Sequence, residues 1–163
     1  MTLAVADTSP LNYLVLIGEV DLLPRLFARV LIPDVVAGEL RDPAAPLPVA
    51  EWITHPPSWL EICPTPVSPE RFERLDEGER AAILLALAQP STVTLLIDDA
   101  DGRAEADRRA IPTTGTLGVL RAAAVLGLVD LPAALGRLGA TSFRSPAAVI
   151  DQLLSEDRQR KRG

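Results

Sequence analysis

The amino-acid sequence predicts an α/β protein, a three-layer α/β/α sandwich with a mostly parallel sheet of about five strands. Short aliphatic runs alternate along the chain with segments of helical periodicity. The runs are apolar at consecutive positions, which is typical of strands that are buried on both faces of a parallel sheet. The chain has 163 residues, 48% of them hydrophobic. We therefore expect a single domain over residues 1–163 with a sizeable core.

The first elements follow from local signals. The run LAVA at residues 3–6 predicts a buried strand. Thr8, Ser9 and Pro10 then favour a helix that runs to about Gly18, because Thr and Ser cap helices and Pro suits a first turn. A short helix over 20–27, a strand over 29–32 and a helix from about Pro33 come next.

The proline-rich stretch 43–69 predicts a loop with about one helical turn, and a strand near LEIC at 60–63. The rest of the chain alternates more clearly between apolar runs and helical patterns. We expect helices over 78–88, 100–110, 116–128, 132–139 and 146–160, and strands over 92–97 and 111–114.

Composition excludes several classes of protein. The N-terminus has no basic region and is interrupted by Asp7 and Pro10, so we expect no signal peptide and a cytoplasmic location. The most apolar stretch, 117–136, contains two charges and a proline, which argues against a membrane span. The single Cys63 cannot form an internal disulfide or supply a zinc cluster. The only histidine, His55, lies in a proline loop, which argues against a histidine-based triad.

The chain ends in a basic segment, DRQRKRG, although its formal net charge is −6. The cations from Arg158 to Arg162 suit the end of a solvated helix, where they interact with the negative pole of the helix dipole. They would equally suit contact with phosphates or with an acidic partner. We expect a basic helix end or tail at about residues 156–163.

Acidic side chains follow two of the predicted strands. Asp7 comes after the first strand, and Asp98, Asp99 and Asp101 come after LLI. The carboxyl ends of parallel strands meet at one edge of a sheet, where α/β proteins bind their ligands. Two unit charges about 4 Å apart repel by roughly 4 kcal/mol at an effective dielectric near 20, so such a group must be solvated, protonated or bound to a cation.

Two helices offer further acids to the same edge. Glu39 and Glu79 both continue the apolar stripe of their helix and are not on its solvent face. Four elements that deliver carboxylates to one edge indicate a bound cation. Mg²⁺ or Mn²⁺ is the natural candidate, because hard divalent cations prefer oxygen ligands.

Each acid also has a purely structural interpretation. Asp7, Asp99 or Asp101 would each be a suitable helix cap, and capping is the better explanation for any one of them alone. Glu39 would pair with Arg41 or Arg71, and Glu79 would be an ordinary first-turn acid.

Other acid-rich α/β families lack support. Receiver domains and aspartyl-phosphate phosphatases need a lysine beside the phosphoryl group, and the only lysine here is Lys161 in the tail. The first strand is followed by DTS and not by a second aspartate in a DxD pair. Neither a P-loop nor a GxGxxG turn is present.

Four segments occur in the order and spacing of a known family: VADTSPLNYL, IPDVVAGEL, LDEGERAAILLALA and LLIDDADGRAEADRRAIPTTGTLGVLRAA. From about residue 3 to 150 the chain resembles the PIN-domain superfamily. More narrowly, it is similar to an uncharacterised prokaryotic branch related to VapC-type toxins. The resemblance implies a ribonuclease whose acids hold one or two Mg²⁺ or Mn²⁺ ions, a small antitoxin partner and a homodimer.

The resemblance also implies roles for single residues. Asp7 matches the acid after the first strand, Glu39 the helical glutamate, and Glu79 the acid that opens the central helix. The acid cluster falls on IDDAD, where many members have Thr or Ser before a more widely spaced pair. The metal ligand is thus open among Asp98, Asp99 and Asp101, and we favour Asp99 and then Asp98.

Substrate-binding candidates lie beside these acids. Thr8 and Ser9 either orient Asp7 or a metal-bound water, or only cap a helix. Arg103 is the best placed of three arginines on its helix to contact the substrate backbone, while ion pairing with Glu105 and Asp107 is the simpler expectation for all three.

The segment PTTGTLGVL offers one more candidate. Gly115 would let the backbone turn, and Thr116 would cap the following helix. The N-terminus of that helix would suit an anionic phosphate. Capping alone also explains the pattern.

The leading hypothesis is a divalent-metal-dependent endoribonuclease, the toxin of a type II toxin–antitoxin pair, which hydrolyses RNA phosphodiesters with a metal-activated water. One alternative is a catalytically inactive PIN-like module that binds nucleic acid or protein. A weaker alternative is a metal-dependent phosphohydrolase of small substrates.

Overall fold

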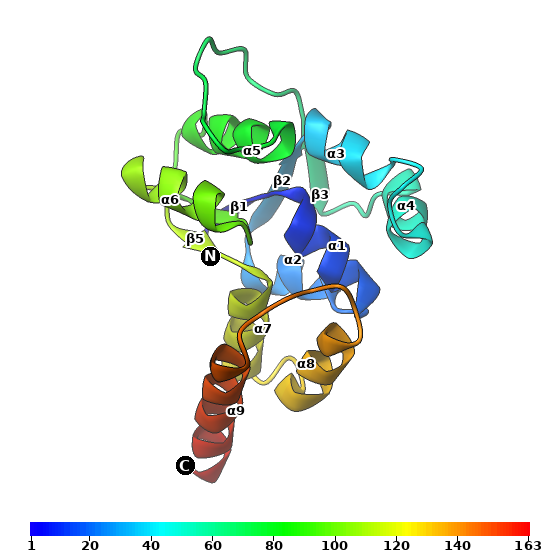
Figure 1. The fold of residues 1–163 in the computed structure, drawn as a ribbon, viewed down its shortest axis with the longest axis vertical. Coiled ribbons are helices and arrows are strands. Elements are labelled where there is room, and N and C mark those ends of the chain that lie inside the picture. The colour runs from blue at the N-terminus through cyan, green and yellow to red at the C-terminus, as the bar shows by residue number, and fades with distance from the viewer.

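Residues 1–163 are described by a computed structural model in which one five-stranded sheet is covered by helices on both faces (Figure 1). The strands are β1 (Leu3–Ala6), β2 (Arg29–Pro33), β3 (Leu60–Cys63), β4 (Val93–Leu96) and β5 (Thr113–Thr114). The first helices are α1 (Thr8–Leu16), the 3-10 helix η1 (Val20–Leu22), α2 (Leu23–Leu26), α3 (Asp34–Leu40) and α4 (Leu47–Thr54). The others are α5 (Glu77–Leu87), α6 (Ala100–Arg108), α7 (Thr116–Val125), α8 (Leu131–Gly139) and α9 (Ala147–Arg162).

The strand order is β3-β2-β1-β4-β5, and every neighbouring pair is parallel. The chain therefore builds the sheet outward from β1 on one side and returns to build β4 and β5 on the other. β1 and β4 are neighbours at the centre, with Ala6 opposite Leu96. Ligands bind at such a switch in strand order, just beyond the carboxyl ends of the strands.

Side chains of the central strands alternate between two cores. Ala4 and Ala6 of β1 belong to the larger core, while Leu3 and Val5 belong to the smaller one. The smaller core lies under α5 and α6, and the larger one under α1, α3 and α7 (Figure 1). Burial on both faces explains the uninterrupted apolar runs, and the three-layer α/β/α prediction is confirmed.

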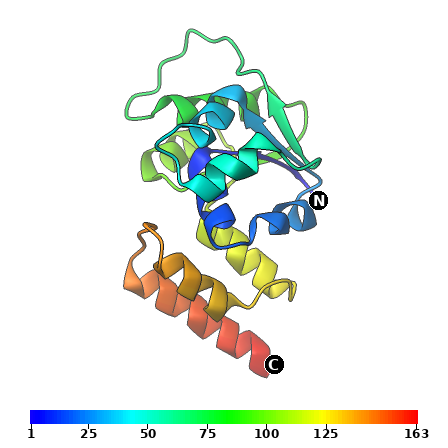
Figure 2. The same ribbon diagram turned by 90° about the vertical axis from the view of Figure 1, so that its right-hand side faces the viewer.

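Helices α7, α8 and α9 extend the larger core away from the sheet. Leu120 of α7 is completely buried and belongs to the same core as Leu131 of α8 and Leu153 of α9. Both views show α8 and α9 projecting from the side of the sheet that carries α7 (Figures 1 and 2). The basic segment is the end of α9, where Arg160 and Lys161 form ion pairs with Asp157.

One predicted element differs in the structure. The segment expected to contain a single helical turn holds α4, an eight-residue helix. Pro48 lies in its first turn, where proline costs nothing, and Val49 and Ile53 form a fully buried pair four residues apart. No helix is both long enough and apolar enough for a bilayer crossing.

Candidate active site

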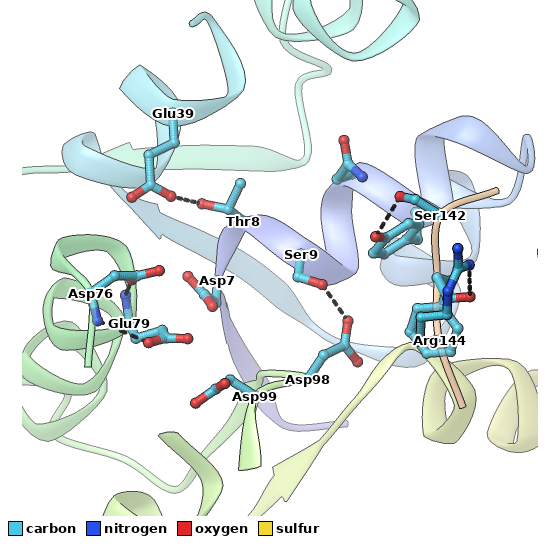
Figure 3. A pocket seen from close by; sticks show the side chains of 13 residues that line it. Asp7, Thr8, Ser9, Glu39, Asp76, Glu79, Asp98, Asp99, Ser142 and Arg144 are labelled. Carbon is cyan, nitrogen blue, oxygen red and sulfur yellow. Dashed lines mark hydrogen bonds between the residues drawn. The ribbon is translucent and has the colours of Figure 1, made fainter. Parts of the chain in front are cut away.

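A cavity of about 550 Å³ opens at the carboxyl edge of the sheet (Figure 3). Six carboxylic acids from four parts of the chain line it: Asp7, Glu39, Asp76, Glu79, Asp98 and Asp99. The other lining residues are Thr8, Ser9, Asn12, Tyr13, Ser142, Phe143 and Arg144. Five of the six acids are those that the sequence analysis selected.

Asp7 lies between the other acids, directly after β1 (Figure 3). Its backbone N–H donates to Leu96 O at 2.9 Å, which continues the sheet by one residue. Asp7 is the N-cap residue of α1, but its side chain makes no capping hydrogen bond to that helix, so capping alone does not explain the carboxylate. Only 5% of Asp7 is exposed. Burial, together with the nearby acids Asp76, Glu79 and Glu39, raises its pKa to about 8.

Glu39 reaches the cavity from α3. Thr8 Oγ1 donates a hydrogen bond to Glu39 Oε2, while neither Arg41 nor Arg71 forms an ion pair with it. The carboxylate lies against Gly78 of α5, where an added Cβ would be 2.6 Å from both of its oxygens. A glycine is therefore required at position 78 if Glu39 is to occupy this place.

Asp76 and Glu79 enter the cavity together from the start of α5. The Glu79 N–H donates to Asp76 Oδ1 at 2.8 Å, and the Asp76 N–H donates to Glu79 Oε1 at 2.9 Å. This reciprocal capping box fixes both side chains at the helix end. Glu79 is 8% exposed, and burial raises its pKa with help from neighbouring acids. Asp76 was not among the acids expected from the sequence, although the D-x-x-E spacing is a signal for such a box.

Asp98 follows β4 and is held by three hydrogen bonds. Its Oδ1 accepts from Thr116 N at 2.7 Å, and its Oδ2 accepts from Ser9 Oγ at 2.7 Å and from Thr116 Oγ1 at 2.8 Å. Thr116 is completely buried and does not cap α7, whose N-cap is Gly115. Gly115 lies between β5 and α7, but its φ of −109° is open to any residue, so the backbone there does not require a glycine. A Cβ there would lie 2.6 Å from Asp98 Oδ1, which is the reason for the glycine.

The remaining acids of the IDDAD segment lie in different surroundings. Asp99 is the N-cap of α6, with Oδ2 accepting from Gly102 N at 2.9 Å, and it also lines the cavity. The capping interpretation thus holds for Asp99 without removing it from the site. Asp101 is exposed and lines a separate hollow beside Arg74 and Arg108, so the structure does not bring it to the other acids.

The cavity holds almost no compensating positive charge. None of the six acids takes part in a salt bridge, and Arg144 is the only cation that lines the cavity. A set of carboxylate and hydroxyl oxygens has the donor chemistry that suits Mg²⁺ or Mn²⁺. No three of the acids are already gathered as a metal-ligand cluster in this structure. The residues therefore fit a hard cation by their chemistry, but not as a preformed cage.

A family model described as a PIN domain matches residues 3–159. The chain belongs to the PIN-domain family. PIN domains are generally nucleases that use divalent metals, which agrees with an acid-lined cavity at the carboxyl edge of the sheet. No curated protein and no solved structure matches the chain. The relation to VapC-type toxins stays a prediction.

The hydroxyl residues of this PIN domain contact acids other than the expected one. Thr8 and Ser9 were expected to orient Asp7 or a metal-bound water, or only to cap a helix. In the structure Thr8 donates to Glu39 and Ser9 to Asp98. Thr116 also donates to Asp98. These three hydroxyls therefore hold the acids in place, and their contact with substrate stays a prediction.

One wall of the cavity comes from the α8–α9 loop, which no sequence pattern indicated. Tyr13 Oη and Ser142 Oγ are 3.0 Å apart, and the rings of Tyr13 and Phe143 meet edge to face at 5.0 Å. Tyr13 and Ser142 are 129 residues apart in the chain. Only tertiary packing joins them, so no local motif records the contact.

Arg103 lies outside the acid cavity and lines a neighbouring one. Its neighbours on α6 follow the simpler expectation of ion pairing. Arg108 and Arg109 both pair with Glu105, and Arg109 also reaches Glu70. Arg103 forms no salt bridge.

Proposed function

We propose that this PIN domain is a divalent-metal-dependent endoribonuclease and acts in the cytoplasm as the toxin of a type II toxin–antitoxin pair. One observation carries the nuclease proposal: Asp7 is buried at the centre of five other carboxylates without a counter-ion. Such a group costs stability in the empty protein unless it is protonated. Binding of a cation best explains why the protein has these uncompensated carboxylates despite the loss of stability.

Asp7, Glu39, Glu79 and Asp99 are the residues that would hold Mg²⁺ or Mn²⁺. Asp98 also lines the site but already accepts three hydrogen bonds, so we give it second place. When bound, such an ion lowers the pKa of a water molecule and stabilises the departing oxygen during phosphodiester hydrolysis. Thr8 orients Glu39, and Ser9 and Thr116 orient Asp98. No histidine lines the cavity, and this chemistry needs none.

Two other functions follow from specific features. The acids are not gathered as a metal-ligand cluster, which favours a PIN-like binding module that has lost catalysis. The open, acid-lined cavity would also suit a phosphohydrolase of small substrates. A labelled RNA pool assayed beside small phosphoesters separates that activity from ribonuclease activity.

The decisive experiment is a titration with Mn²⁺ followed by thermal unfolding. A ligand at about 100 times its Kd stabilises the native state by roughly 2.7 kcal/mol, or about 5–10 °C in Tm for a domain of this size. We expect this increase for the wild type and none for Asp7→Asn. Asp101→Asn is the matched control, because Asp101 is an acid outside the cavity, and it should respond like the wild type.

RNA cleavage should depend on the same metal and vanish in Asp7→Asn. If the wild-type Tm does not change with Mn²⁺ or Mg²⁺ and the RNA pool is not cleaved, the inactive binding module is the better proposal.

The toxin role is tested separately, in cells. Growth should stop when the chain is expressed alone and resume when the product of a small neighbouring reading frame is co-expressed.

A further inference from the structure

A second cavity, of about 410 Å³, adjoins the acid cavity. The two share Asp98, Phe143 and Arg144 as lining residues. Arg103 of α6 also lines the second cavity, close to the backbone of Gly115. The two cavities are thus neighbours on either side of Asp98, and the second is lined by two arginines from distant segments of the chain.

The two guanidinium groups in this cavity have no acidic partner. Neither Arg103 nor Arg144 forms a salt bridge, and the one hydrogen bond of the Arg144 side chain goes to Phe143 O at 3.3 Å. Asp98 also lines this cavity, but neither guanidinium forms an ion pair with it, and both of its oxygens accept hydrogen bonds from Ser9 and Thr116. Both arginines are exposed and free to bind an anion.

We propose that Arg103 and Arg144 form a phosphate-binding subsite for the RNA strand, beside the position where the strand is cut. The inference rests on the proposed function, in which RNA is the substrate. A guanidinium donates two parallel hydrogen bonds to phosphate, and such contacts position a nucleic acid without reading its sequence.

The position of the subsite explains how an acidic cavity can accept a polyanion. The six carboxylates repel every phosphate that approaches, and the chain as a whole is negative. A strand that is held by Arg103 and Arg144 would have its next phosphate presented on the Asp98 side of the acids. Figure 3 shows Arg144 on that side, with Asp76 and Glu79 opposite. Phe143 lines both cavities and offers an aromatic surface for a base of a single strand.

The experiment measures binding of a short, labelled, mixed-sequence single-stranded RNA in the presence of Mg²⁺. Asp7→Asn is the background, so that no strand is cut. Arg103→Gln and Arg144→Gln should each weaken binding about tenfold and lower the slope of log affinity against log salt by about 0.7. Arg144→Lys should recover only part of the loss, because it keeps the charge without the planar fork.

Arg25→Gln is the matched control. Arg25 is exposed and forms no salt bridge. It lies on α2, which leads into the start of β2, so Arg25 is at the edge of the sheet opposite to the acid cavity. Its substitution should leave both affinity and salt slope unchanged. All the variants should keep the parent Tm, because each substituted side chain is exposed.

The proposal is overturned if the Asp7→Asn protein with all its arginines intact does not bind the RNA. It is also overturned if the two arginine variants bind like the Arg25 control, or if poly-glutamate displaces the RNA at equal charge concentration. These failures are distinct from failure of the nuclease proposal. If the wild type cleaves RNA, and the arginine substitutions change neither binding in the Asp7→Asn background nor cleavage in the wild-type chain, only the subsite is wrong. If binding needs both arginines but nothing is cleaved, only the nuclease is wrong.

Discussion

Asp7 is more deeply buried than the other five acids of the cavity. This position lowers the stability of the metal-free protein when Asp7 is charged, but it suits the proposed binding of a cation. Its backbone is tied to the sheet through Leu96, so the carboxylate cannot move out to solvent with a flexible loop. Burial and neighbouring acids raise its pKa to about 8. Without a cation, the folded protein therefore holds a proton on Asp7 at neutral pH.

Proton binding by Asp7 predicts how stability varies with pH when no divalent metal is present. The pKa of this group is 3.8 before burial and about 8 in the folded protein, so the native state binds the extra proton between these values. The contribution of Asp7 to the free energy of unfolding is fully present below pH 3.8. It decreases by up to about 1.4 kcal/mol per pH unit as the pH rises towards 8.

Urea unfolding of the wild type and Asp7→Asn from pH 5 to 8, with a chelator present, checks this prediction. The stability of Asp7→Asn relative to the wild type should increase as the pH rises, because asparagine carries no charge to bury. Parallel pH profiles for the two proteins would contradict it.

Gly78 offers a way to change the site without unfolding the protein. In Gly78→Ala the new Cβ would lie 2.6 Å from the Glu39 carboxylate, which is the mobile end of a long side chain and can rotate away. Alanine also favours the helical state over glycine by up to about 1 kcal/mol. Metal-free Gly78→Ala should keep or slightly raise its Tm, while the Tm increase with Mn²⁺ should shrink.

Gly38→Ala is the control for this effect, because nothing lies within 4 Å of its added Cβ. That variant should keep the full response to Mn²⁺. An unchanged response in Gly78→Ala would mean that Glu39 is not a ligand.

The acids of the site were largely predictable from the sequence, whereas their partners were not. Asp7, Asp98 and Asp99 follow strands, and Glu39 and Glu79 continue apolar stripes, so each has a local signal. Asp76 had a local signal that was overlooked. Tyr13 and Arg144 come to the cavity through contacts between distant segments, which depend on the packing of α8 and α9 and leave no pattern in the chain.

Among the elements, the loop between β3 and α5 has the clearest dependence on single contacts. It carries Asp76 to the cavity and is held by two arginines. Arg80 donates to Ser68 O at 2.8 Å and to Glu70 O at 3.1 Å. Arg109 pairs with Glu70 at 2.9 Å and lies over the Phe72 ring at 4.9 Å.

Arg109→Ala should loosen this loop. The loss of two partly exposed ion pairs, with Glu70 and Glu105, and of a cation–π contact should lower the free energy of unfolding by about 1 kcal/mol. Amide hydrogen exchange should increase in residues 64–75. Arg108→Ala is the control, because Arg108 has one exposed pair with Glu105 on its own helix. Equal exchange in the two variants would show that Arg109 does not anchor the loop.

The elements themselves were predicted well where the hydrophobic period is regular. β1, β4, α5 and α7 have uninterrupted signals and occur close to their expected positions. The exception is the two-turn helix α4, because five prolines between residues 43 and 57 predict a loop there. Its two buried residues are too few for a periodic signal, and packing under the larger core stabilises it.

At the scale of the whole molecule, Tyr13 joins the helical unit α7–α9 to the α/β layers at the site. Its hydroxyl contacts Ser142, and its ring contacts Phe143, next to Arg144. Tyr13→Ala should release the α8–α9 loop, so RNA binding should fall about as far as in Arg144→Gln. The Tm increase with Mn²⁺ should persist, because the hydroxyl of Tyr13 forms its hydrogen bond with Ser142 and not with one of the acids.

Tyr13→Phe is the control for this coupling, since it keeps the edge-to-face contact and loses only the bond to Ser142. It should bind RNA nearly as well as the parent. Full RNA binding by Tyr13→Ala would show that the loop keeps its position without this contact.

Two glycines also give a simple criterion for sorting other members of this family. Gly78 leaves room for the Glu39 carboxylate, and Gly115 leaves room for that of Asp98. A related chain that retains every acid but has a larger residue at either position cannot hold the neighbouring carboxylate as it is held here. In such a chain, a complete set of acids would therefore not be enough to indicate an intact site.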